Sequence, residues 1–257
     1  MTLLAVAVAG RGLVRPDEPV FAADDEALLR GGAAFETLRV YAGRPLLLDR
    51  HLERLRSSAE ALALPTPDGA EELVGLVVGS APPEHVLRIY RTGRVLLATA
   101  TTLPDDLEAL RSRGLTLQTV ETSASGLLPG VKSTSYAEAF AARRSVDADD
   151  ALLVSGDLVR ECATANIWWR REETLYTPAV GPGVLPGVTR AFVLELEPAV
   201  EGAFRLDELQ GADEAFTTSS IREVMPVVAV DGAAVGDGRP GPAAARLQAL
   251  LRLRSVT

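Results

Sequence analysis

The sequence predicts a mixed α/β protein of the α+β class, folded as two domains. Segments that alternate apolar and polar residues, as half-buried strands do, are interspersed with segments whose apolar residues recur at helical spacing. The run Thr122-Ser123-Ala124-Ser125-Gly126 is small, polar and flexible, as interdomain linkers are. We therefore expect an N-terminal domain over residues 1–121, a linker over 122–126 and a C-terminal domain over 127–257, and 257 residues suffice for two cores.

Composition excludes several classes of partner. A net charge of −9 and a pI near 4.9 argue against binding to nucleic acid or to an anionic membrane. Cys162 is the single cysteine, so no intramolecular disulfide forms and a reducing cytoplasm fits. The apolar run near the N-terminus lacks a basic flank and is far shorter than a membrane span, so we expect a strand there. Because the chain has only two histidines, we expect no multi-histidine metal site.

The expected N-terminal domain contains strands and two helices. The predicted strands cover residues 3–9, 35–41, 45–48, 85–91, 94–100 and 115–121, and the predicted helices cover 49–63, with Asp49 as N-cap, and 69–78. In the strand 35–41, Phe35, Thr37, Arg39 and Tyr41 share one face. This mixture of aromatic and polar groups suits a pocket wall or the solvated face of an edge strand equally well.

His51 and Arg54 lie three residues apart on the first predicted helix, beside its apolar stripe, so both side chains can point the same way. They fit either an anion site or a solvated helix shoulder. By themselves, these two residues favour the solvated shoulder.

The expected C-terminal domain begins with a helix. Predicted elements are a helix over 133–145, a hairpin over 151–160, a strand that carries Trp168 and Trp169, a helix ending near residue 196, a strand over 215–220, a hairpin through Asp231-Gly232, and a closing helix over 241–252. Because successive residues of a strand face opposite sides, we expect at most one of the two tryptophans in the core.

Lys132 is the only lysine of the chain, whereas the other 25 basic residues are arginines. An amine can lose its proton and form an imine with a carbonyl compound, which a guanidinium cannot do. The residue lies just before the predicted helix 133–145, and the field of a helix N-terminus favours the unprotonated amine. The alternative is a lysine left by codon bias, since Asn166 is likewise the only asparagine.

Three further features strengthen the catalytic interpretation. Glu161 ends an apolar strand, where a partly buried carboxylate needs a partner. The glycine-rich segment 181–190 opens a helix whose first amides suit a phosphate, and the predicted strand 215–220 delivers the hydroxyl cluster 217–220. A lysine, a buried carboxylate and a phosphate cradle are together what pyridoxal phosphate chemistry requires.

The chain resembles the fold-type IV pyridoxal-phosphate enzymes, the class IV aminotransferase family, which includes 4-amino-4-deoxychorismate lyases. The matching segments, in family order, are Phe35-Glu36-Thr37, 50–55, Lys132, 161–166, 185–190, 218–220 and 223–227. The resemblance implies a small N-terminal α/β domain, a larger C-terminal domain with a β-barrel-like sheet, pyridoxal 5'-phosphate as cofactor, and a homodimer.

The resemblance also implies roles for individual residues. Lys132 forms the imine with the cofactor and moves the substrate proton, while Glu161 pairs with the pyridine nitrogen. The phosphate is held by Arg54, Val188, Thr189 and Ser220. The Ser220-Ile221 backbone meets the substrate carboxylate, and Tyr136 resembles a tyrosine that contacts the ring hydroxyl, although it follows the lysine by four residues where branched-chain enzymes have five.

Sequence details favour a lyase over an aminotransferase. Cys162 follows Glu161 where aminotransferases commonly have glycine, and the Arg-x-His of D-amino-acid aminotransferases is replaced by Arg91-Thr92-Gly93-Arg94. We therefore expect an aminodeoxychorismate lyase that releases pyruvate and 4-aminobenzoate, a folate precursor, with Arg39, Arg91 and Arg94 as candidates for the substrate carboxylates. The alternatives are an aminotransferase for D- or branched-chain amino acids, and a protein without this chemistry.

Overall fold

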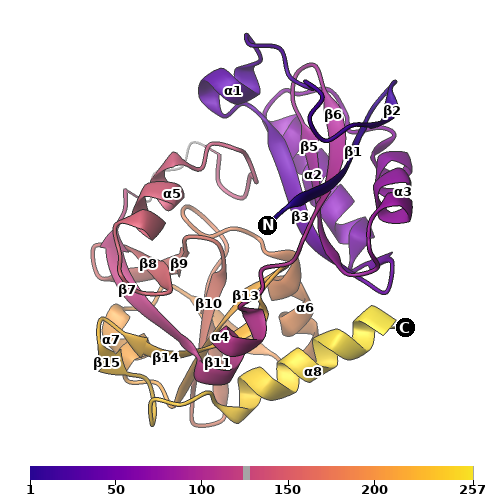
Figure 1. Cartoon of the computed structure of the whole chain (residues 1–257). Helices are drawn as coiled ribbons and strands as arrows, with labels where there is room; N and C mark the ends of the chain where they lie inside the picture. Colours follow the sequence, from indigo (N-terminus) through magenta and orange to yellow (C-terminus); the bar gives the residue numbers. More distant parts are fainter. Residues whose placement is uncertain (124–127, 257) are drawn as a thin grey trace. The chain divides into compact units, whose positions relative to one another are not determined.

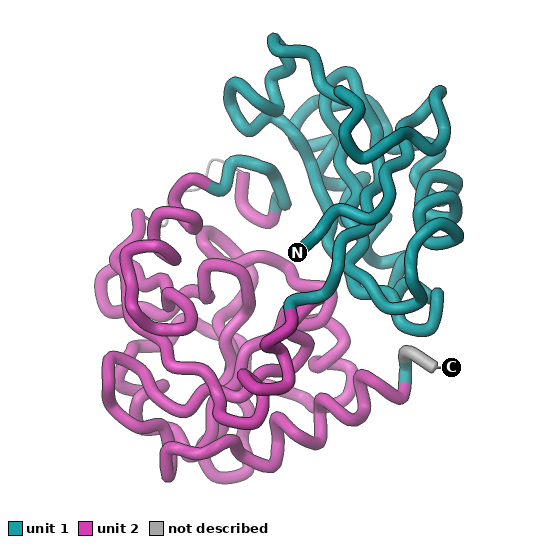
Figure 2. The backbone as a smooth tube through the Cα atoms, in the orientation of Figure 1, with its two compact units in different colours: residues 1–104, 131–136, 254–257 teal, residues 105–130, 137–253 magenta. Residues whose placement is uncertain are grey.

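The computed structural model describes residues 1–123 and 128–256, and these form two compact units (Figure 1; Figure 2). The first unit contains residues 1–104, 131–136 and 254–257, and the second contains 105–130 and 137–253. The segment 131–136, which carries the only lysine, therefore returns to the first unit although it follows the start of the second. Residues 124–126 of the expected linker lie outside the described residues.

An antiparallel sheet with the strand order β2-β1-β6-β5-β3-β4 forms the first unit. Its strands are β1 (Leu3–Val8), β2 (Gly12–Val14), β3 (Ala34–Tyr41), β4 (Arg44–Pro45), β5 (His85–Arg91) and β6 (Leu96–Thr101), and its helices are α1 (Glu26–Arg30), α2 (Leu48–Ala61) and α3 (Ala70–Ser80). Helices α2 and α3 pack on one face of the sheet, where Leu38 and Val40 of β3 enter the apolar core. The alternation predicted for β3 is thus confirmed on this face.

The opposite face of the sheet mixes aromatic and polar side chains. In the pairing of β3 with β5, Phe35 lies opposite Tyr90 and Thr37 lies opposite Arg88. In the pairing of β5 with β6, Arg88 lies opposite Thr99. Residues that share a face of adjacent strands in this way are side-by-side neighbours, so the pairing gathers polar groups around Arg88.

Helix α2 begins differently from the sequence expectation. Only Arg44 and Pro45 form the strand expected over 45–48, because Leu47 adopts a left-handed conformation with φ 54° and turns the chain directly into the helix. Leu47, and not Asp49, is the N-cap residue, and no side chain caps the helix. The prediction for Asp49 was wrong. Its negative charge in the first turn nevertheless interacts favourably with the helix dipole.

The second unit contains a nine-stranded sheet that curls into a half-barrel (Figure 1). Its order is β12-β11-β10-β13-β14-β7-β8-β9, with β15 paired to β14. The strands are β7 (Leu115–Glu121), β8 (Asp150–Ser155), β9 (Leu158–Cys162), β10 (Asn166–Arg171), β11 (Thr174–Pro178), β12 (Ala199–Gly202), β13 (Glu214–Ser219), β14 (Glu223–Val230) and β15 (Ala233–Ala234). The helices are α4 (Leu107–Arg113), α5 (Ala137–Arg144), α6 (Val188–Leu196), α7 (Leu206–Gln210) and α8 (Pro242–Val256).

Strand β7 shows how non-local pairing divides the chain. We expected it to close the N-terminal domain, but it pairs in parallel with β14 on one side and with β8 on the other. Both partner strands follow β7 by tens of residues, so the local sequence does not indicate that β7 belongs to the sheet of the second unit. The contacts of the chain therefore separate the units near residue 104, ahead of α4.

Trp168 and Trp169 are both fully buried, so the expectation that at most one lies in the core was wrong. Their strand β10 is central in the sheet, between β11 and β13. Trp168 stacks on Phe216, while Trp169 meets the edge of Phe204 with ring centroids 5.1 Å apart. In a strand that is covered on both faces, the side chains that point to either face are buried.

Among the described residues, no helix has the length and apolar character that crossing a membrane requires.

Candidate active site

Lys132 lies in an extended segment beside β3. Its carbonyl accepts a hydrogen bond from the Phe35 amide at 3.1 Å, and its own amide donates to Ser58 Oγ at 3.1 Å. Helix α5 begins only at Ala137, so the helix-terminus argument for the amine was wrong. The lysine is held at both peptide groups by the first unit, which fixes where its side chain starts.

The amine of Lys132 lies among aromatic groups. Its Nζ is 4.5 Å from the ring centroid of Phe35 and 3.4 Å from the hydroxyl oxygen of Tyr136. Tyr136 also meets the edge of the Phe35 ring, with centroids 5.6 Å apart. The spacing of four residues between Lys132 and Tyr136 therefore allows the tyrosine hydroxyl to reach the lysine amine. Its contact with the cofactor ring stays a prediction.

Glu36, His51 and Arg54 form a buried polar cluster under β3. Arg54 Nε and Nη2 donate to the two carboxylate oxygens of Glu36 at 2.7 and 2.8 Å, and His51 Nδ1 lies 2.7 Å from Glu36 Oε2. Glu36 is 0% exposed, and the side chains of His51 and Arg54 are 2% and 11% exposed. The solvated-shoulder interpretation of His51 and Arg54 was therefore wrong.

The side chains of this cluster influence one another's pKa. Burial opposes ionisation of Glu36, but hydrogen bonds from Arg54 and His51 and the charge of Arg54 outweigh it and lower its pKa to about 2. Burial also lowers the pKa of His51, so the neutral imidazole donates its Nδ1 hydrogen to the carboxylate. Glu36 therefore orients the guanidinium of Arg54, the residue expected to hold a phosphate, in a bidentate pair.

In the second unit, Glu161 is half-buried at the end of β9. Its Oε2 accepts hydrogen bonds from Asn166 Nδ2 and from the amide of Leu185, each at 2.9 Å. Asn166 Nδ2 also donates to the Leu185 carbonyl at 2.9 Å. A Cβ on Gly187 would lie only 2.1 Å from Asn166 Oδ1, so this position must be glycine for Asn166 to keep its place. Two hydrogen-bond donors thus fix the position of this carboxylate oxygen.

The N-terminus of α6 has the chemistry of an anion site. Gly187 is its N-cap, and no side chain caps the helix. Val188 and Thr189 form the buried first turn, each 6% exposed, and first-turn amides have no partner within a helix. The amides, the Thr189 hydroxyl and the helix dipole together suit a phosphate, as the sequence led us to expect.

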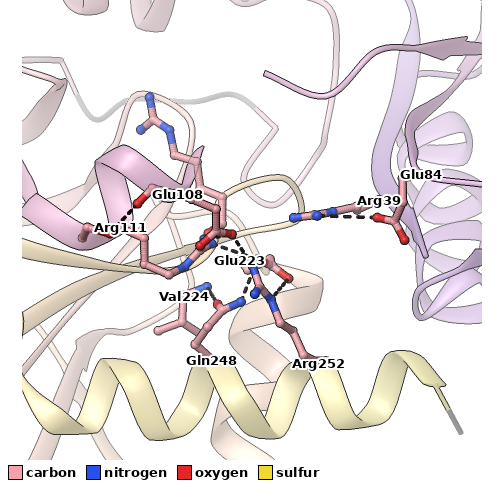
Figure 3. Close-up of polar contacts among 10 residues, drawn as sticks. Arg39, Glu84, Glu108, Arg111, Glu223, Val224, Gln248 and Arg252 are labelled. Carbon is pink, nitrogen blue, oxygen red and sulfur yellow. Dashed lines mark hydrogen bonds and ion pairs between the residues drawn. The ribbon is translucent and has the colours of Figure 1, made fainter. Parts of the chain in front are cut away.

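The turn 220–222 between β13 and β14 contains Ser220 and Ile221 and is anchored by Glu223. Glu223 is fully buried and has φ 62°, which non-glycine residues adopt rarely and at a cost. Its Oε2 accepts from Arg111 Nη2 at 2.8 Å, Arg252 Nη2 at 3.0 Å and Gln248 Nε2 at 2.7 Å (Figure 3). Helices α4 and α8 therefore hold the end of the turn through one carboxylate.

The three arginines proposed for substrate carboxylates have other contacts. Arg39 lies over the Tyr41 ring, and its Nη2 is 3.6 Å from Glu84 Oε2 (Figure 3). Arg91 donates to the Pro65 carbonyl at 2.8 Å. Arg94 lies at the surface, and its two terminal nitrogens donate to both carboxylate oxygens of Asp24.

The chain matches the family model described as "Amino-transferase class IV" over residues 33–230, which is more than half of its length. The chain belongs to the class IV aminotransferase family.

Relatives within this family have different activities. The chain is 27% identical to an aminodeoxychorismate lyase of Bacillus subtilis, over 89% of this chain and 87% of that protein. It is 29% identical to a D-alanine aminotransferase of Bacillus licheniformis, over 89% of each. A structure titled a hypothetical aminotransferase from Mycobacterium tuberculosis, PLP-bound form, superposes with a TM-score of 0.89 at 25% identity, over 98% of this chain and 99% of that one. The expected fold class is confirmed.

The class IV residues expected at the site fall in two groups. Lys132, Tyr136 and Arg54 belong to the first unit. The second unit contains the others, which are Glu161, Val188, Thr189, Ser220 and Ile221. Arg54 lies within helix α2, whereas the other expected residues lie on loops or near the ends of elements.

Sequence reasoning missed Glu36 and Asn166 as parts of the site. Glu36 had a signal, since it shares a strand face with Leu38 and Val40 and a carboxylate on an apolar face needs a cation. Asn166 had a weaker one, as the only asparagine of the chain.

Cys162 behaves as expected for a small buried residue, since burial raises the pKa of its thiol well above the usual value. In the described part of the chain, no group of three or more His, Cys, Asp or Glu side chains is placed to hold a metal ion.

Proposed function

We propose that the protein is a pyridoxal 5'-phosphate-dependent 4-amino-4-deoxychorismate lyase, which converts its substrate to pyruvate and 4-aminobenzoate. Membership of the class IV family and the likeness to a PLP-bound structure support the cofactor. The similarity to the B. subtilis lyase supports the reaction, while the similar D-alanine aminotransferases supply the alternative.

The residues present fit this cofactor. Lys132 supplies an amine beside aromatic groups, and Glu161 supplies a carboxylate held in place by two hydrogen-bond donors. The uncapped N-terminus of α6, with Thr189, supplies amides and a hydroxyl for a phosphate. Arg54, oriented by Glu36, supplies a guanidinium of the kind that pairs with a phosphate. When bound, pyridoxal phosphate accepts the electrons of the bond broken at the substrate carbon.

The chain's own residues then have defined tasks. The Lys132 amine, once displaced by the C4 amine of the substrate, removes the C4 proton. The C3–O bond to the enolpyruvyl group breaks, the ring becomes aromatic, and the departing enolate takes a proton to give pyruvate. The Tyr136 hydroxyl, 3.4 Å from the amine, can orient Nζ for this transfer. No amino-group acceptor takes part.

The observation that favours the lyase is that Arg91 and Arg94 are engaged in other contacts. They occupy the segment where the resemblance to D-amino-acid aminotransferases would require an Arg-x-His for the substrate carboxylate. Here Arg91 is bonded to a carbonyl, and Arg94 is paired with Asp24 at the surface. Neither provides the carboxylate site that an α-amino acid would need in that segment.

Product analysis tests the proposal. Purified protein loaded with pyridoxal phosphate is incubated with aminodeoxychorismate and without a keto acid, and pyruvate and 4-aminobenzoate are quantified. Equal amounts of both products, absent with Lys132→Ala, would support the lyase. Turnover of D-alanine or leucine with 2-oxoglutarate, and no release of 4-aminobenzoate, would reject it in favour of an aminotransferase.

We further propose a cytoplasmic homodimer that supplies a folate precursor. The single buried cysteine and the acidic composition support the compartment. Sedimentation equilibrium measures the oligomeric state, and a monomer that is fully active would reject the dimer.

A further inference from the structure

A cavity of about 450 Å³ lies in the first unit, on the face of the sheet opposite the apolar core. Strands β1, β5 and β6 contribute to its wall. Most of the lining is apolar, and the polar side chains include Arg88, Tyr90, Thr99, Thr101 and Thr134. Apolar cavities with a few convergent polar groups are the usual form of small-molecule sites.

Arg88 is the basic side chain in the lining of this cavity, and the described residues provide no counter-ion for it. It is half-buried, and its Nη1 donates to Thr101 Oγ1 at 2.9 Å. In residues 1–123 and 128–256, no carboxylate is paired with it. Glu18, the acidic residue of the lining, is paired with Arg11 instead. A guanidinium in a largely apolar cavity without an acidic partner is suited to an anionic ligand, above all a carboxylate that it can bind through two donors.

The cavity adjoins the surroundings of Lys132. Thr134, two residues after the lysine, forms part of its lining. The Tyr90 ring, also in the lining, stacks on Phe35 at 5.9 Å between centroids, and Phe35 is the ring beneath Lys132 Nζ. Tyr90 and Phe35 therefore connect the lysine amine to the cavity along one face of the sheet.

The position of Arg88 along β5 sets how far its charge lies from the reacting amine. Phe35 is opposite Tyr90, whereas Arg88 is opposite Thr37, two residues further along the strands. Two residues of a strand span roughly 7 Å. Arg88 therefore suits a carboxylate remote from the reacting carbon. In aminodeoxychorismate the C1 carboxylate lies across the ring from the C4 amine, whereas an α-amino acid has its carboxylate on the carbon that bears the amine.

We propose that this cavity receives the ring carboxylate of the substrate and that Arg88 is its anchor, a proposal that rests on the lyase function above. Arg88 would thereby favour a ring acid over an α-amino acid as substrate. It replaces Arg39, Arg91 and Arg94 as the candidate for this role.

Binding of the product tests the anchor apart from catalysis. 4-Aminobenzoate has the same amine and carboxylate at opposite ends of a ring, and its affinity for the PLP-loaded protein is measured by calorimetry. The variants are Arg88→Met and Arg88→Lys, and the control is Arg15→Met, which removes a charge from a side chain that is 80% exposed in the same unit. 4-Methylaniline, which has no carboxylate, is the control ligand.

We expect Arg88→Met to weaken 4-aminobenzoate binding by ~10-fold or more, Arg88→Lys to weaken it less, and Arg15→Met to change it less than ~2-fold. Binding of 4-methylaniline should not depend on Arg88. Failure of the wild type to bind 4-aminobenzoate, unchanged affinity in Arg88→Met, or an equal loss for 4-methylaniline would overturn the proposal. Arg88-dependent binding without release of pyruvate would reject the lyase function and leave the carboxylate site standing.

Discussion

Replacing Glu36 by glutamine tests whether the cluster beneath β3 is a charged pair. Glutamine keeps the shape of the protonated acid but cannot carry the negative charge that Arg54 and His51 surround. Because Glu36 is fully buried, solvent cannot compensate for the lost charge. The guanidinium of Arg54 would remain largely buried beside a neutral amide.

The magnitude follows from the pKa of Glu36. Lowering that pKa from 4.5 to about 2 on folding corresponds to about 3 kcal/mol of stability at neutral pH. The pKa is lower in the folded state, so this contribution is present above the unfolded value of 4.5 and is lost as the pH falls towards about 2. Glu36→Gln should therefore cost about 3 kcal/mol at pH 7 and progressively less as the solution becomes acidic.

Urea unfolding followed by circular dichroism at several pH values between 7 and 2.5 measures this difference. The matched control is Glu84→Gln, since Glu84 is a half-exposed glutamate of the same unit whose pair with Arg39 spans 3.6 Å. The control should cost less than about 1 kcal/mol at any pH. If the cost of Glu36→Gln does not change with pH, or if Glu84→Gln costs as much, the charged-pair reasoning is refuted.

Two further substitutions test the second unit. Gly187→Ala should weaken pyridoxal phosphate binding by ~10-fold or more, because a Cβ there displaces Asn166 from Glu161, while Gly93→Ala, where a Cβ meets no atom within 4 Å, should leave it unchanged. The cofactor absorbance band during titration measures both, and equal affinities would contradict the role of Gly187. Glu223→Gln should lower the free energy of unfolding by roughly 3 kcal/mol, because it leaves two arginines facing a neutral group, and the exposed Glu173→Gln should change it by less than about 0.5 kcal/mol. Urea unfolding distinguishes them, and a Glu223→Gln protein as stable as the wild type would show that the turn is anchored otherwise.

Local sequence patterns determined much of the framework. The predicted strands 85–91 and 115–121 match β5 and β7, because alternation over six or seven residues is a strong local signal. The same alternation put Glu36 on one face of β3 and Phe35 on the other. The single lysine and the order of the motifs led to the family to which the chain belongs.

Tertiary structure alone decided which groups meet. Glu36 and Arg54 are 18 residues apart, and only the packing of α2 on β3 turns a helix shoulder into a buried ion pair. Glu161 accepts a hydrogen bond from the amide of Leu185, 24 residues away. Lys132 is placed by a backbone hydrogen bond from Phe35 of β3, which lies in another part of the chain. Periodicity fixes the face of an element on which a side chain lies, but the group opposite that face depends on long-range pairing, which the local sequence does not encode.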